Sequence, residues 1–138
     1  DTLIKVDIEI YKTDKLKKFI EGLFLSKYYG NEISLKRIEI KLYSSLVDLH
    51  PLIVKVVIPE IIYNIKKYVS NDDSIISITI GSEAIQFENR YHQMERSQKI
   101  SNGVGLLMCE RILENLFMRK LEIIDDNIDF FKIKIYLK

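Results

Sequence analysis

The sequence contains few of the residues that form covalent cross-links or metal centres. Its 138 residues include one cysteine, which excludes an internal disulfide, and two histidines, too few for a convincing metal cluster. No apolar run approaches the ~20 residues of a membrane-spanning helix, so we expect no membrane contact by this segment itself. A formal net charge of +1 provides no overall electrostatic attraction for a nucleic acid, and we expect none as a partner.

The length of the chain favours a single domain. A chain of 138 residues can bury a substantial core, but it is too short for two such cores. Apolar residues make up 47% of the sequence and charged residues 30%, the balance of an ordinary globular protein. We therefore expect residues 1–138 to form one domain. The start at Asp1 rather than at Met favours a fragment of a longer protein.

Hydrophobic periodicity predicts strands and three helices in a mixed order. Apolar residues at every second position indicate strands, and apolar residues three and four positions apart indicate helices. Because proline lacks an amide proton, Pro59 should kink or restart the helix around it. The predicted elements are a strand at 4–10, a helix at 16–24, a strand at 38–42, a helix at 60–69, a strand hairpin at 76–87, a mobile polar loop at 90–102, a helix at 106–117 and strands at 121–123 and 131–137.

This order of elements predicts an α/β sandwich of two layers, of the α+β type. Such a mixture favours one sheet, mixed and mostly antiparallel, with the three helices stacked on one face. Cys109 lies on the apolar face of the third helix and is expected to pack there. The helix residues expected to face the sheet are Leu16, Phe19, Leu23, Ile65, Leu113 and Leu116.

Two of the five glycines in the chain, Gly103 and Gly105, lie one residue apart at the head of the third helix. Glycine leaves the backbone amides unobstructed, and the amino end of a helix favours an anion. The pair is therefore either an ordinary loop before a helix or a place where the backbone comes close to a phosphate group.

Three short segments, in this order, resemble the motifs of one superfamily. Residues 60–68, Glu-Ile-Ile-Tyr-Asn-Ile-Lys-Lys-Tyr, are similar to an asparagine box, a helix in which an asparagine is followed by a lysine and an aromatic residue. Phe87-Glu88-Asn89 lies where that superfamily has its adenine-binding aspartate, and Gly103-Val104-Gly105-Leu106 is similar to its last glycine box. The superfamily is that of the histidine-kinase and gyrase ATPases (GHKL), which share the Bergerat fold. Over nearly the whole chain, the order and spacing resemble the catalytic, ATP-binding domain of a sensor histidine kinase.

The resemblance implies a role for each residue of the asparagine box. Asn64 would hold the Mg²⁺ ion carried by the nucleotide, a role that suits an uncharged oxygen ligand. Lys67, one turn further along the helix, would reach a phosphate, and Tyr68 would contact the nucleotide. The residues taken alone leave other interpretations open, because Asn64 can be a helix-surface asparagine and Lys66-Lys67 a solvated face.

The resemblance also implies contacts outside the box. Asn89 would accept a hydrogen bond from the adenine amino group, and Gly103 and Gly105 would hold the phosphates. Arg96 and Lys99, in the polar loop, would close over the phosphates as a lid, although they can equally be solubilising charges.

Several positions depart from the family pattern. Asn89 replaces the usual aspartate, and an amide oxygen accepts a hydrogen bond more weakly than a carboxylate does. Arg90 and Leu107 stand where the family has glycine, so bulk replaces a small, flexible position. Glu60 precedes the asparagine of the box by one turn. A glutamate at this spacing activates the attacking water in the gyrase-like branch, but it also suits the first turn of a helix after Pro59.

The resemblance implies a cytoplasmic catalytic domain with ATP and Mg²⁺ as cofactors. It would supply the γ-phosphoryl group to a histidine on a separate dimerisation and phosphoacceptor domain, with a response regulator as a further partner. Neither His50, before a proline, nor His92, in the polar loop, matches that phosphoacceptor. The lost glycines leave open a pseudo-kinase module that keeps the fold as a docking or regulatory surface without ATP turnover. Glu60 leaves open a third interpretation, an ATP hydrolase of the same superfamily.

Overall fold

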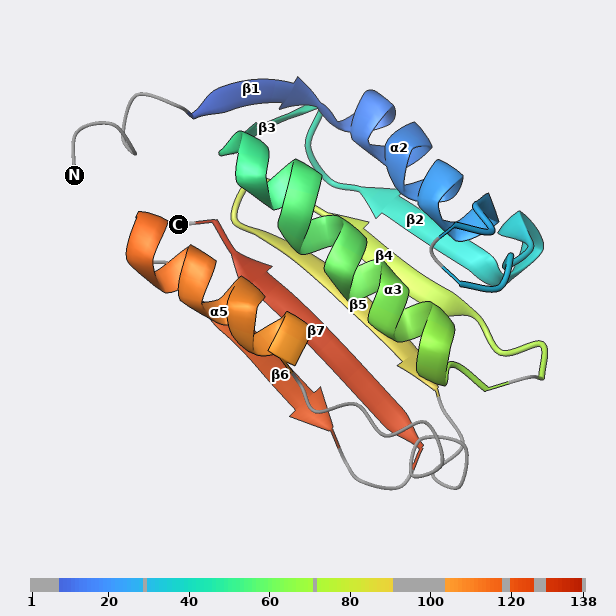
Figure 1. Ribbon diagram of the computed structural model, residues 1–138. Helices are drawn as coiled ribbons and strands as arrows, with labels where there is room; N and C mark the ends of the chain where they lie inside the picture. The colour runs from blue at the N-terminus through green and yellow to red at the C-terminus, as the bar shows by residue number, and fades with distance from the viewer. Residues whose placement is uncertain are drawn as a thin grey trace.

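A layer of helices lies over one face of a β-sheet (Figure 1). The computed structural model describes residues 8–28, 30–70, 72–90, 104–117, 120–125 and 129–137. The helices are α2 (Thr13–Leu25), α3 (Ile58–Tyr68) and α5 (Val104–Phe117), with a short 3-10 helix at Leu35–Arg37 and a π-helical turn at Ile53–Val57. The strands are β1 (Glu9–Lys12), β2 (Ile38–Leu42), β3 (Leu46–Leu49), β4 (Ile76–Ile80), β5 (Ala84–Arg90), β6 (Leu121–Asp125) and β7 (Phe130–Tyr136).

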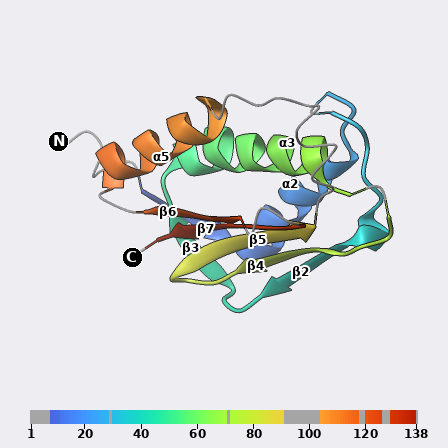
Figure 2. The same cartoon turned by 90° about the horizontal axis from the view of Figure 1, so that it is seen from below.

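Five strands form the main sheet, in the order β2-β4-β5-β7-β6. β2 and β4 pair in parallel, and the remaining neighbours pair antiparallel. Seen from below, α2, α3 and α5 lie on the same side of this sheet (Figure 2). The predicted two-layer arrangement, with a mixed, mostly antiparallel sheet and the helices on one face, is therefore confirmed.

β1 and β3 form a second, two-stranded antiparallel sheet that the sequence patterns did not predict. Tyr11 pairs with Val47, which is buried, whereas Ile10 pairs with the exposed Asp48 on the outer side. Ile8 is 37% exposed and Ile10 is 70% exposed, so the apolar residues that indicated the strand at 4–10 do not face the core there. Alternation identifies two faces of a strand, but it does not say which face the fold covers. The predicted strand residues before Ile8 lie outside the described part of the chain.

The core lies between the main sheet and the helices and consists mostly of isoleucine and leucine. Four of the six helix residues predicted to face the sheet are buried: Leu16, Leu23, Ile65 and Leu113. Each such side chain contributes roughly 1.5–3 kcal/mol when it leaves water. Phe19 is 38% exposed, so the prediction is wrong there. α2 lies over the edge strand β2 (Figure 1), and one flank of the helix therefore has no strand beneath it. The side chain of Leu116 lies outside the described residues.

Pro59 lies in the first turn of α3, directly after the π-helical turn. A proline in the first turn of a helix costs little, because the amide proton that it lacks would have no partner inside the helix. The backbone stays helical through Val57 and Ile58, so the predicted disturbance around Pro59 takes the form of a change from π-helical to α-helical pairing. Ile53, Val57, Ile61 and Ile65 are buried along the combined segment, which makes it the central element of the helix layer.

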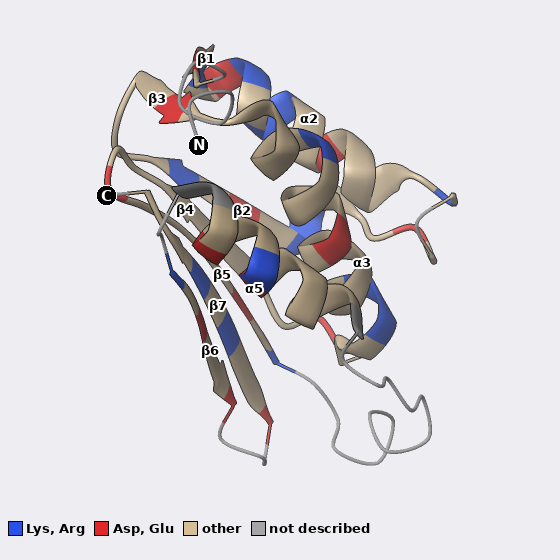
Figure 3. Ribbon diagram, turned by 60° about the vertical axis from the view of Figure 1, so that its left-hand side comes forward, with Lys and Arg blue, Asp and Glu red and all other residues tan. Residues whose placement is uncertain are grey.

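Charged residues of both signs lie on neighbouring strands of the main sheet (Figure 3), and alternation with the buried Ile133 and Ile135 places the lysines of β7 on the face opposite the helices. Lys132 and Lys134 of β7 pair across the ladder with Glu88 of β5 and Glu122 of β6, respectively. Opposite charges at such positions contribute roughly 0.2–1 kcal/mol per pair. This face is therefore a solvated surface, and the residues predicted to bind a ligand have to be sought on the helix side.

Candidate functional site

α3 carries the asparagine-box residues from its first turn to its end. Asn64 is partly buried, and its Nδ2 donates a hydrogen bond to the backbone oxygen of Glu60, one turn earlier, at 2.9 Å. The bond occupies the amide nitrogen and leaves the carbonyl oxygen Oδ1 as the atom that can accept a ligand. An uncharged oxygen is a group that Mg²⁺ accepts. The local geometry of Asn64 therefore fits the role expected of it.

Lys67 lies between two aromatic rings of the same helix. Its Nζ is 6.0 Å from the centroid of the Tyr63 ring and 5.5 Å from that of the Tyr68 ring. An ammonium at these distances is attracted by the ring faces, an interaction worth about 0.5–1 kcal/mol when exposed. Tyr68 itself is buried, with 9% of its surface exposed. The aromatic neighbours hold the charge of Lys67 in the last turn of α3, one turn after Asn64.

Lys66, by contrast, does not lie on a solvated face, and the sequence-based interpretation of Lys66-Lys67 as such a face is wrong for this residue. Its side chain is 6% exposed, and Nζ donates to the backbone oxygens of Leu23 at 2.8 Å and Ser26 at 2.5 Å. These are carbonyl groups at the end of α2 that have no partner inside that helix. Burial lowers the pKa of Lys66, and the charge of Glu32 opposes part of that shift. Lys66 therefore joins α2 to α3, which is a structural role.

Asn89 lies at the end of β5 on the side of the sheet that faces the helices. It is 4% exposed, and its oxygen Oδ1 has no hydrogen-bond partner among the described residues. Its nitrogen Nδ2 donates to the backbone oxygen of Arg90 at 3.3 Å, a long bond. Leaving a buried acceptor unpaired costs roughly 1–3 kcal/mol. An unpaired oxygen at a predicted site residue is the feature expected of a group that awaits a ligand.

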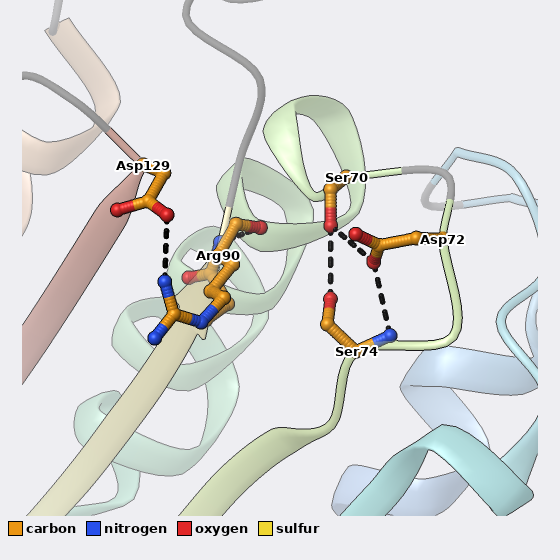
Figure 4. Close-up of polar contacts among 6 residues, drawn as sticks. Ser70, Asp72, Ser74, Arg90 and Asp129 are labelled. Atoms are coloured by element: carbon orange, nitrogen blue, oxygen red, sulfur yellow. Dashed lines mark hydrogen bonds and ion pairs between the residues drawn. The ribbon is translucent and has the colours of Figure 1, made fainter.

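The end of β5 is tied to the end of α3 and to the start of β7 (Figure 4). The backbone nitrogen of Ser70, two residues after α3, donates to the backbone oxygen of Arg90 at 3.0 Å. The Arg90 guanidinium donates to Asp129 at 2.6 Å. Ser70 also bonds through its hydroxyl to Asp72 and Ser74, which fixes the turn after α3. The bulky side chain at position 90 is thus directed toward Asp129, and no signal in the sequence predicts this pairing.

Glu60 and Gly105 bring α3 and α5 together. A Cβ atom at position 105 would overlap the carboxyl group of Glu60, so the two residues are in direct contact. Cys109, one turn further along α5, is fully buried, and its thiol lies near the backbone oxygen of Val57. Burial, and then the charge of Glu60, raise the pKa of Cys109 to about 12. Packing is the role predicted for this cysteine, and its burial agrees with that.

The structure therefore brings most of the described site residues together. Glu60, Asn64, Lys67 and Tyr68 follow one another along α3, and Gly105 contacts the first of them. Asn89 is joined to the end of the same helix through the Ser70–Arg90 bond. Arg96, Lys99 and Gly103 lie outside the described residues, as does the predicted mobile loop apart from Arg90.

Other features lie away from this region. His50 is buried, and its Nδ1 accepts from the backbone nitrogen of Leu52 at 3.1 Å, which agrees with a structural histidine. A surface hollow of about 600 Å³ opens beside the start of α2 and the loop after β2, and no predicted site residue lines it. Within the described ranges, the His, Cys, Asp and Glu side chains form no group of three that could hold a metal ion. None of the helices in those ranges has the length and hydrophobicity needed to cross a membrane.

Solved structures of histidine kinases have the same arrangement of elements. The cytoplasmic segment of histidine kinase QseC superposes with a TM-score of 0.63 at 13% identity, over 94% of this chain and 77% of that one. Histidine kinase AdeS of Acinetobacter baumannii superposes with a TM-score of 0.63 at 16% identity, over 99% and 73%. The catalytic domain of histidine kinase ThkA gives 0.57 at 15% identity, over 94% and 96%.

This chain has the histidine-kinase catalytic fold. The fold that the resemblance implied is therefore confirmed, as the fold that these histidine-kinase structures share. No protein-family model matches the sequence, and no curated protein matches it either. At 13–16% identity the fold persists while most side chains differ, so the roles of individual residues have to be argued from this structure.

Proposed function

We propose that residues 1–138 form a single ATP-binding catalytic domain of a two-component sensor histidine kinase. The observation that carries the proposal is the buried, unpaired oxygen of Asn89 next to the end of α3. The fold alone does not need this amide, since an apolar residue at position 89 would avoid the cost of the unpaired oxygen. The similarity to the ThkA catalytic domain over 96% of that chain supports the assignment of one domain.

In this proposal, two side chains of the described region contact the nucleotide and a third contacts its metal ion. Asn89 accepts a hydrogen bond from the base, Asn64 offers Oδ1 to the metal ion, and Lys67 contacts a phosphate. When bound, Mg²⁺ would neutralise phosphate charge and help to align the terminal phosphoryl group for transfer. The chain's own residues position the nucleotide, and the phosphoryl group passes to a histidine on a separate domain. A cytoplasmic location and a response-regulator partner belong to the same proposal.

The proposal is tested by titrating the purified chain with a non-hydrolysable ATP analogue, with and without Mg²⁺, by calorimetry. We expect saturable binding that requires Mg²⁺ and that Asn64→Ala and Asn89→Ala each weaken at least about tenfold, the equivalent of about 1.4 kcal/mol. Asn115→Ala, which removes an exposed asparagine on α5, is the matched control and should leave binding unchanged. No heat at millimolar nucleotide would instead support the pseudo-kinase module, a docking surface without nucleotide.

One observation favours a second candidate, an ATP hydrolase. The carboxyl group of Glu60 lies against Gly105, in the glycine box predicted to hold the phosphates, and one turn before Asn64 on α3. A carboxylate so placed can accept a proton from an attacking water. Steady release of phosphate from ATP by the chain alone, lost in Glu60→Gln while nucleotide binding persists, would support this candidate. Transfer to a supplied phosphoacceptor domain without phosphate release would support the kinase.

A further inference from the structure

The side-chain amide of Asn89 is the polar group of interest, because it is buried and held by only one weak bond. Its Oδ1 has no partner within the described residues, and its Nδ2 is 3.3 Å from the backbone oxygen of the adjacent Arg90. The residue is 4% exposed. A buried amide usually makes several bonds that fix its orientation. This one can rotate by half a turn at the cost of a single long hydrogen bond.

The surroundings of Asn89 are apolar. Alternation along β5 places it on the same face as Ile85 and Phe87, which are 0% and 1% exposed. Its neighbour across the ladder is Phe131 of β7, which packs against the core. Ile85 and Phe87 belong to the covered core, so the partly exposed Phe131 is the apolar side chain at this strand end that a flat heterocycle could contact, with the amide of Asn89 at its polar edge.

The choice of an amide at this position decides which edge can be bound. A carboxylate only accepts hydrogen bonds, so it suits the 6-amino group of adenine and repels the 6-oxo group of guanine. An amide has both an acceptor and a donor. With Oδ1 toward the ligand it accepts from a 6-amino group, and after rotation it donates from Nδ2 to a 6-oxo group. Rotation also turns Oδ1 toward the Arg90 oxygen, and this repulsion keeps a modest preference for adenine.

We propose that Asn89 makes the base site tolerant of both 6-amino and 6-oxo purines, so that the chain binds ATP and GTP with similar affinity. The inference rests on the proposed nucleotide-binding function and specifies its substrate class. A purine nucleoside triphosphate, rather than an adenine nucleotide alone, is then the ligand of this site.

The test measures Mg²⁺-dependent binding of non-hydrolysable ATP, GTP and ITP analogues to the wild-type chain and to Asn89→Asp. We expect wild-type affinities for the three nucleotides to agree within about tenfold, a difference of about 1.4 kcal/mol. In Asn89→Asp the preference for ATP over GTP should rise about 100-fold, because the 6-oxo group then faces a buried acceptor. Asn115→Asp makes the same chemical change on the exposed side of α5 and should leave the ratio unchanged.

Each other outcome has a distinct meaning. If the wild type binds none of the three nucleotides, the proposed function itself fails. If it binds ATP and rejects GTP by clearly more than about tenfold, nucleotide binding stands and the inference is overturned. Binding of GTP without ITP also overturns it, because both carry the 6-oxo group and only guanine has a 2-amino group. Should Asn89→Asp fail to fold, the three wild-type affinities still decide the question.

Discussion

The carboxyl group of Glu60 occupies the space beside Gly105 that any side chain at position 105 would need. The two residues lie on different helices, so this contact sets how closely α5 approaches α3. Glu60 is partly exposed, and its long side chain can rotate away if the space is taken. Glu60 therefore favours glycine at position 105 without requiring it, because a side chain there would displace the carboxyl group from its present place.

Gly105→Ala should therefore depend on the residue at position 60. In the wild-type chain the added methyl group must displace the Glu60 carboxyl group, which offsets the gain that alanine provides over glycine in the first turn of α5. In a Glu60→Ala background the overlap is absent and Gly105→Ala should stabilise the protein. A double-mutant cycle on urea unfolding should give a coupling of at least about 1 kcal/mol.

Gly22→Ala provides the control for this cycle. Gly22 lies within α2, and a Cβ atom there would meet nothing within 4 Å. The substitution should stabilise the protein by about 0.5–1 kcal/mol whatever residue stands at position 60. If the effects of Gly105→Ala and Glu60→Ala on the free energy of unfolding are additive, the contact between the two residues does not restrict the side chain at position 105.

Lys66→Met should lower the free energy of unfolding by about 1–3 kcal/mol, because the carbonyl groups of Leu23 and Ser26 lose a buried donor. Methionine keeps most of the length and apolar contact of the lysine stem. Lys55→Met changes an exposed lysine of the neighbouring π-helical turn and should have an effect within about 0.5 kcal/mol. Denaturant unfolding of the two variants checks this, and equal effects would contradict a linking role for Lys66.

The thiol of Cys109 should react with a thiol reagent at pH 8 only as fast as the protein opens. Its pKa is raised to about 12 by burial, so the reactive thiolate is scarce in the folded state, and the side chain is fully buried. Because the chain has one cysteine, the labelling rate reports a single position. Denaturant should accelerate labelling in step with global unfolding. Rapid labelling of the folded protein would contradict the burial.

The same thiol predicts a loss of stability in alkali. The folded pKa of about 12 lies above the ordinary value of 9.0, so the folded protein keeps a proton that the unfolded chain releases. The stabilising contribution is complete below about pH 9 and declines as the pH rises toward 12. Lys66 acts in the opposite direction, since its pKa is lowered. The effect of Lys66 is the same in the wild type and in Cys109→Ala, so it cancels when the two are compared. The variant should show the smaller loss of stability as the pH rises.

Asp129→Asn should change the stability by less than about 1 kcal/mol, although the Arg90–Asp129 pair is short. Both side chains are about half exposed, so water screens the attraction and the long arginine loses conformational freedom. Backbone pairing over seven positions, from Ala84 opposite Tyr136 to Arg90 opposite Phe130, holds β5 to β7 without the ion pair. The free energies of unfolding of the wild type and the variant, measured in low and in high salt, should become equal in high salt. A large difference that persists in high salt would contradict this.

Much of the fold could be predicted from periodicity, because most strands and helices have one face toward a single core. The hairpin at 76–87 and the helix containing Asn64 were predicted on this basis. β3 was missed because its four residues, three of them apolar, are too few to show an alternation. The exposure of Ile10 and Phe19 was not predicted, because hydrophobic periodicity shows only which residues share a face. Which face is covered depends on the tertiary arrangement.

The candidate site was less predictable than the fold. The motif order located Asn64, Asn89 and the glycine pair, whose roles remain predictions. The burial of Lys66 could not be predicted, since it depends on the carbonyl groups of α2, about forty residues earlier in the chain. The contact of Arg90 with Asp129 is equally distant in sequence. Such contacts follow from how the elements pack, and no local pattern encodes them.

The pairing of β5 with β7 also constrains how the protein forms during synthesis. Residues 84–90 remain without their partner on one side until residues 130–136 have been made, and α5 and β6 lie between them in the sequence. Until then, the apolar side chains of β5 and its unpaired backbone edge are open to other chains. Non-local pairing of this kind slows folding. Ribosome-bound chains that end before residue 130 should therefore recruit chaperones, and release of the chaperone should coincide with emergence of the last strand.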